Sequence, residues 1–158
     1  MPNLKLQGSR ALNVIPSNNT NIPMPSVIVS DVTTSTVTDK LVDSTKNFIS
    51  LGVQIGDIVY NTTSSVAAKV TNVDSATQLS LNADIMVSSD SYILYSGTNI
   101  SGSIEPCVLY VGVGGDLEVT TAGGDLVTFI GISSGTFLPI HVIKVNTGTT
   151  ATDIIALW

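Results

Sequence analysis

Residues branched at Cβ dominate this chain and constrain its fold more than any other feature. The 158 residues include 19 Val, 16 Ile and 19 Thr, about a third of the total. Branching at Cβ restricts the side chain on a helical backbone and suits the pleated surface of a sheet. Short apolar runs are separated by Gly, Asn, Asp and Ser, which are typical turn residues. We therefore predict an all-β protein with at most one helical turn.

Charge and cysteine content exclude several classes of function. Six Lys and Arg oppose twelve Asp and Glu, which gives a formal net charge of −6, whereas nucleic-acid binding needs clustered cations. A single cysteine rules out an internal disulfide and a cysteine-based metal cluster. No apolar run reaches the roughly 18 residues of a membrane helix, and the start MPNLKLQGSR lacks the apolar region of a signal peptide. We expect no nucleic-acid partner and no membrane partner.

The chain divides into an arm and two small β units. Residues 1–25 contain four prolines and a polar stretch, so we interpret them as an extended N-terminal arm. Residues 11–15 of this arm are apolar enough to add a strand to the C-terminal unit. Residues 26–97 form the first unit and residues 98–158 the second. In the first unit we predict strands at 26–29, 53–60, 66–73, 78–81 and 91–95, and one helical turn at 44–50 capped by Ser44.

A repeated motif predicts a meander in the second unit. The apolar strand 107–113 is followed by Gly114-Gly115-Asp116 and strand 117–121, and then by Gly123-Gly124-Asp125 and strand 126–130. Glycine permits the positive φ that tight hairpin turns require. We therefore predict two consecutive hairpins from residue 107 to residue 130. Further strands are expected at 139–145 and 153–158.

The two units are small for independent domains. They hold about 72 and 61 residues, near or below the size at which one core supplies comfortable stability. Few Lys or Glu are available to discourage their strand edges from pairing with other chains. We therefore expect a stable homo-oligomer or a lattice-bound protein, in the form of two small β-barrel or β-sandwich units. The extended arm would span about 80 Å and could wrap a neighbouring subunit.

No group of residues predicts catalysis, a cofactor or a metal. His141, the only histidine, lies in a predicted strand with mostly apolar neighbours, so we interpret it as a core or interface residue. Cys107 lacks the basic or helix-terminal setting that activates a thiol, and we expect it to pack as a small hydrophobe. Residues 112–116 lack the following helix of a dinucleotide loop. The acids match no calcium loop, and two Glu give little support to a glycosidase.

Residues 109–158 carry a long series of distinctive motifs. They comprise Tyr110–Gly112, Gly115–Asp116, Thr120–Asp125, Val127–Phe129, Gly135–Thr136, Leu138–Pro139, Thr147–Thr152 and Ala156–Trp158. The series resembles the ending of head spike base proteins of tailed phages and gene transfer agents. Residues Arg10–Leu12, Ile15–Ser17, Thr20 and Pro23 resemble the opening of the same family. Residues 26–103 then look like an insertion into the family's pattern.

The resemblance implies an architectural role without catalytic residues. The expected protein sits on the capsid exterior of a virion, as a head decoration or spike base, bound to the major capsid protein. It would be a trimer or pentamer, with a spike fibre as a further partner. The candidate assembly residues are Arg10, Leu12, Ile15, Pro16 and Trp158. Alternatives are a tail, neck or baseplate component, and a carbohydrate-binding module that would use Trp158 and the four Tyr.

Overall fold

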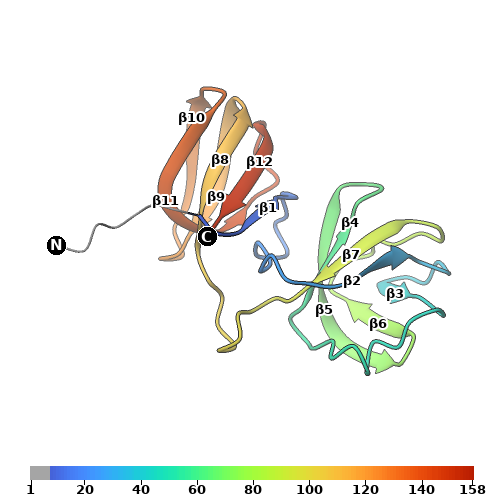
Figure 1. Cartoon of the computed structure of the whole chain (residues 1–158). Helices are drawn as coiled ribbons and strands as arrows, with labels where there is room; N and C mark the ends of the chain where they lie inside the picture. Colours follow the sequence, from blue (N-terminus) through green and yellow to red (C-terminus); the bar gives the residue numbers. More distant parts are fainter. Residues whose placement is uncertain (1–7) are drawn as a thin grey trace.

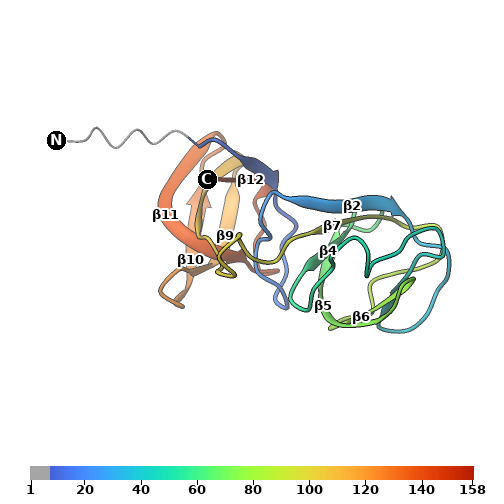
Figure 2. The ribbon, with the colours of Figure 1, turned by 60° about the horizontal axis from the view of Figure 1, so that its bottom comes forward.

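Two antiparallel sheets make up the protein. The computed structural model describes residues 8–158, and these residues form two sheets of six strands each, with no helix. The prediction of an all-β fold is therefore confirmed. The two sheets form separate units that lie side by side (Figures 1 and 2). In the described part of the chain, no helix has the length and apolar character needed to cross a membrane.

The first unit, which we call the barrel unit, closes on itself. Its sheet has the order β2-β7-β4-β5-β6-β3. The backbone N–H of Thr34 donates to the carbonyl of Val42 at 2.9 Å, and Ser35 forms a β-bridge to Val42. These contacts join the chain just after β2 to β3, so the two ends of the sheet meet. The strands are β2 (Val27–Val32), β3 (Lys40–Val42), β4 (Ile58–Asn61), β5 (Val66–Ser75), β6 (Gln78–Leu81) and β7 (Ser91–Tyr95).

Residues 44–50 form turns, so the predicted helical turn is wrong. The buried Asp43, rather than the predicted cap Ser44, holds the start of this segment. The Asp43 carboxylate accepts hydrogen bonds from the backbone N–H of Thr45 at 2.9 Å and from the Tyr92 hydroxyl at 2.7 Å. These bonds anchor the segment to the barrel, and Phe48 is fully buried there. An Asp that bonds the backbone two residues later favours a turn over a helix.

Two strand predictions in the barrel unit also need correction. The predicted strand 53–60 begins only at Ile58, because Gly56 adopts φ +101° and turns the chain before it. The strand Lys40–Val42 was not predicted, since three residues between polar segments show no periodicity. Its central residue, Leu41, is nevertheless fully buried and pairs with Leu79 of β6.

The second unit, which we call the C-terminal unit, includes a strand from the arm. Its sheet has the order β1-β12-β8-β11-β9-β10. Alternate side chains on β8 and β9 point inward, and Leu109, Val111, Leu117 and Val119 are fully buried. Strands β1 and β10 lie at the two ends of this sheet. The strands are β1 (Ala11–Asn13), β8 (Cys107–Val113), β9 (Gly115–Thr121), β10 (Leu126–Ile132), β11 (Thr136–Val145) and β12 (Thr152–Leu157).

Only one of the two predicted hairpins is present. Strands β9 and β10 form a hairpin in which Gly124 has φ +93°. Strands β8 and β9 are not paired with each other; both pair with β11 instead. The reason lies in Gly114 and Gly115, which do not adopt positive φ. Instead, the absence of a side chain lets other backbone segments lie close to them. A Cβ on Gly114 would lie 2.4 Å from the carbonyl oxygen of Ile132, and one on Gly115 would lie 2.7 Å from the nitrogen of Ala151.

The described part of the arm packs against its own chain. Leu12 of β1 pairs with Ala156 of β12, and the backbone N–H of Ile22 donates to the carbonyl of Ile143 at 2.8 Å. Leu12, Ile22 and Met24 are buried. The apolar side chains of this part of the predicted arm, residues 1–25, thus find partners within the chain, and the wrapping of a neighbouring subunit stays a prediction. Residues 1–7 of the predicted arm lie outside the described residues.

The two units share one hydrophobic core. Ile58, Tyr60 and Tyr95 on the outside of the barrel unit belong to the same buried cluster as Leu109 and Val142 of the C-terminal unit. The Tyr60 and Tyr95 rings meet edge to face, with centroids 5.3 Å apart. Burial raises the pKa of Tyr60 above its usual range. The small size of each unit is thus offset by burial against the other unit.

Candidate functional site

Strand β10, at one end of the sheet, is the most exposed apolar strand of the C-terminal unit. Strand β10 is seven residues long, and within residues 8–158 its only paired neighbour is β9. Leu126 is 63% exposed and Ile130 is 81% exposed. The strand LVTFIGI contains no charged residue and no proline, two of the usual means of keeping a strand edge unpaired. A bulge between Phe129 and Ile132 interrupts only its last residues, where the Gly131 N–H donates to the Asp116 carboxylate at 2.8 Å. Residues 126–129 of this strand therefore present an uninterrupted outer edge and the exposed side chain of Leu126.

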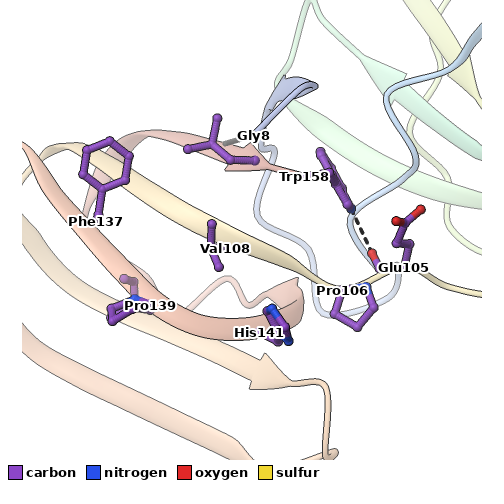
Figure 3. Close-up of a pocket in the computed structure, with 10 residues that line it drawn as sticks. Gly8, Glu105, Pro106, Val108, Phe137, Pro139, His141 and Trp158 are labelled. Carbon is purple, nitrogen blue, oxygen red and sulfur yellow. Dashed lines mark hydrogen bonds between the residues drawn. The ribbon is translucent and has the colours of Figure 1, made fainter. Parts of the chain in front are cut away.

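An apolar groove of about 690 Å³ lies on the outer face of the same unit. Its walls come from Gly8 of the arm, from residues 105–108, from residues 137–141 of β11 and from Leu157 and Trp158 at the end of β12. Figure 3 shows Trp158 and Phe137 on opposite sides of the groove, with Val108 of β8 between them. Phe137 is 63% exposed although its ring packs against Tyr110. Of the lining residues in the described part of the chain, Glu105 alone has a carboxylate side chain.

Trp158 forms a fixed wall of this groove. Its indole N–H donates to the carbonyl of Glu105 at 3.0 Å, and the half-buried ring packs against the edge of the shared core (Figure 3). The backbone N–H of Arg10 donates to the Trp158 carbonyl at 3.3 Å. Trp158 therefore connects the arm, the chain before β8 and the end of β12.

The remaining candidate assembly residues do not gather in one place. Leu12 is buried in the core, and Ile15 packs against the same core. Pro16 is half-buried, and Arg10 is exposed with its guanidinium donating to the carbonyl of Pro25 at 3.3 Å. The contact surface suggested by the structure is instead β10 and the groove. Sequence patterns alone do not reveal it, because exposure of an apolar strand depends on its place in the sheet.

His141 is exposed and lines the groove, so of the two predicted roles, core or interface residue, the core role is wrong and the interface role stays a prediction. It lies on β11, where Pro139 and His141 face outward and Val142 faces the core. The register shift between Leu138 and Val142 makes the alternation on this strand irregular. Alternation along the sequence therefore does not predict whether the His141 side chain faces the core or the solvent. Among the described residues 8–158, no Ser, Thr, Cys or Lys lines the groove beside it.

Cys107 is buried, as expected for a small hydrophobe. It is 2% exposed, and its thiol donates to the carbonyl of Val142 at 3.6 Å. Burial raises the pKa of the Cys107 thiol to about 12. Since the thiolate is the reactive form, the buried thiol is largely unreactive at pH 8.

Cys107 should therefore resist aromatic disulfide reagents in the folded protein at pH 8. The measurement is the release of the coloured thiolate over time, with the same protein in concentrated urea as the control that reacts at once. Rapid modification of the folded protein would contradict the burial of this side chain.

Neither a metal centre nor an aromatic sugar platform emerges from these residues. Within residues 8–158, no three His, Cys, Asp or Glu side chains are close enough to hold a metal ion. Tyr60, Tyr92 and Tyr95 are buried and so have no free face for stacking on a sugar ring. The carbohydrate-binding alternative keeps Trp158, the half-buried Tyr110 and also the exposed Phe137 of the groove, which was not predicted from the sequence.

Comparison with known proteins found no match. No protein-family model, curated protein or solved structure matches this chain.

Proposed function

We propose that this protein is a structural component of a tailed-phage virion, on the capsid exterior. It would act as a head decoration or spike base bound to the major capsid protein, in three or five copies. The proposal rests first on the resemblance of residues 109–158 and of the segment from Arg10 to Pro23 to head spike base proteins.

One structural observation carries this proposal. The two segments that resemble the same family are separated by more than eighty residues, yet they form a single sheet, with Leu12 opposite Ala156. The intervening strands β2–β7 close into a barrel of their own. This is the arrangement expected when a module is inserted between the first strand and the rest of a domain. It supports the insertion that the resemblance implies.

The exposed β10 edge supports an assembled state. A chain with net charge −6 repels its copies, so contact is favoured where the surface is uncharged. The seven residues of β10 carry no charge, and an added strand would complete the open backbone hydrogen bonds along residues 126–129.

Localisation on particles tests the proposal. Particles of the phage or element that encodes the chain are purified through a density gradient, and the tagged chain is detected with gold-labelled antibody. We expect label over the capsid, with particles that carry the untagged chain as the control. Label on the tail, neck or baseplate would favour the alternative location. Absence of the chain from purified particles would overturn a virion role.

A further inference from the structure

We propose that strand β10 of one copy of this chain packs into the apolar groove of a neighbouring copy. Its exposed side chains, Leu126 and Ile130, would lie between the two aromatic rings that line that groove. This inference rests on the proposed assembly of three or five copies. One type of contact closes a ring of three or five copies only if each copy contributes two different surfaces to it. The C-terminal unit carries two such surfaces, the strand and the groove.

The exposed side chains of β10 are the part that would be inserted. Leu126 is 63% exposed and Ile130 is 81% exposed, whereas Phe129 packs against the core of its own chain. Strand β9 separates β10 from β11 in the sheet order, and β11 forms one wall of the groove. The β10 strand therefore cannot fill the groove of its own copy while the sheet stays intact. A second copy can bring it there.

The groove offers apolar contact on more than one side. Phe137 and Trp158 lie on opposite sides of it, and Val108 lies between them (Figure 3). The Trp158 ring is held in place by the hydrogen bond from its indole N–H to the Glu105 carbonyl at 3.0 Å. A volume of about 690 Å³ is typical of pockets that bind small apolar groups. Two aliphatic side chains placed there would lose apolar surface to water.

Opposite charges lie beside the two surfaces. Glu105 is exposed at the groove. Lys144 of β11 lies opposite Thr120 of β9, and Thr120 lies opposite Leu126, so Lys144 is about 10 Å from the inserted strand. The Lys144 ammonium donates to the Asn18 carbonyl at 3.1 Å, and within residues 8–158 neither Lys144 nor Glu105 has an ion-pair partner. A neighbouring copy therefore brings a cation with its uncharged strand, which favours this contact between chains of net charge −6.

Disulfide trapping tests which surfaces meet. Two single variants of the full-length chain, Ile130→Cys and Phe137→Cys, carry tags of different mass, are produced together and are oxidised with copper phenanthroline. Cysteines are bridged only where their Cα atoms lie within about 7 Å of each other. We therefore expect the mixed disulfide as the main product. Cys107 is 2% exposed and should not compete.

The matched control replaces Ile130→Cys with Ile49→Cys, which is 62% exposed on the barrel unit and should give no mixed product. A main product that joins two Ile130→Cys chains would overturn the inference, because β10 would then meet β10. Absence of the mixed disulfide from protein that native mass spectrometry shows to be assembled would also overturn it. Both results would leave the virion proposal standing. Folded protein that contains only single chains would overturn the inference together with the assembly.

Trp158 gives a second readout because it is the only tryptophan. Dilution of the assembled chain to single copies should shift the indole emission to longer wavelength, since Trp158 would lose the cover of the neighbour's side chains. Ile130→Lys should show the longer-wavelength emission at every concentration, and Ile49→Lys should behave as the original chain. Emission that stays constant while sedimentation velocity shows dissociation would overturn the proposed contact.

Discussion

Replacing Leu126 and Ile130 with lysine should dissociate the proposed homo-oligomer into single chains. Both side chains are on the exposed edge strand β10, so lysines there would bring like charges together wherever two copies pair at this edge. We expect association to weaken by at least about a hundredfold, since opposed like charges at an interface cost several kcal/mol. Sedimentation velocity over a range of protein concentrations measures the change.

The matched control for this variant lies in the barrel unit. Val27 and Ile49 are 57% and 62% exposed, and the variant Val27→Lys/Ile49→Lys adds the same charge away from β10. Both double variants should unfold within about 0.5 kcal/mol of the original protein, as substitutions at exposed sites usually do. An oligomer that survives in Leu126→Lys/Ile130→Lys, or that is lost equally in both variants, would contradict a role for β10.

Gly114→Ala should be among the most destabilising single substitutions in the chain. The added Cβ would lie 2.4 Å from the carbonyl oxygen of Ile132 and 2.9 Å from the nitrogen of Ser134, and both atoms belong to the backbone. Relief of this clash requires β8 or the turn after β10 to shift. We expect a loss of about 2 to 3 kcal/mol in the free energy of unfolding, typical of overpacking. Urea unfolding followed by circular dichroism measures it.

Gly123→Ala is the natural comparison because Gly123 occupies the equivalent place in the second GGD motif. The nearest atom to its added Cβ is a side-chain oxygen of Asp125 at 3.4 Å, which can move. We expect a change of less than about 0.5 kcal/mol. Equal destabilisation by the two alanines would contradict the different roles that we assign to the two motifs.

Much of the fold follows from local sequence patterns. Strands 78–81, 91–95 and 107–113 were predicted with the bounds that the structure has, because β-branched and apolar residues alternate between clear turn residues. The pairing of β8 was not predictable in the same way. Glycine is required either where φ is positive, as at Gly124, or where another backbone segment lies too close for a Cβ, as at Gly114. The sequence looks the same in both cases, and only the three-dimensional neighbours show which requirement applies.

The candidate site was largely hidden from sequence analysis. The groove combines Gly8, Glu105, Phe137 and Trp158, which no local pattern brings together. Exposure of β10 follows from its terminal place in the sheet order, a property of the topology rather than of LVTFIGI itself. The closure of the barrel unit likewise shows that a low charge content does not by itself leave strand edges open.

We propose that this chain works as part of an assembly joined through the edge strand β10. Native mass spectrometry of the purified full-length chain at low micromolar concentration should show one defined species of three or five copies. A spectrum of folded protein that contains only single chains would rule out this assembly.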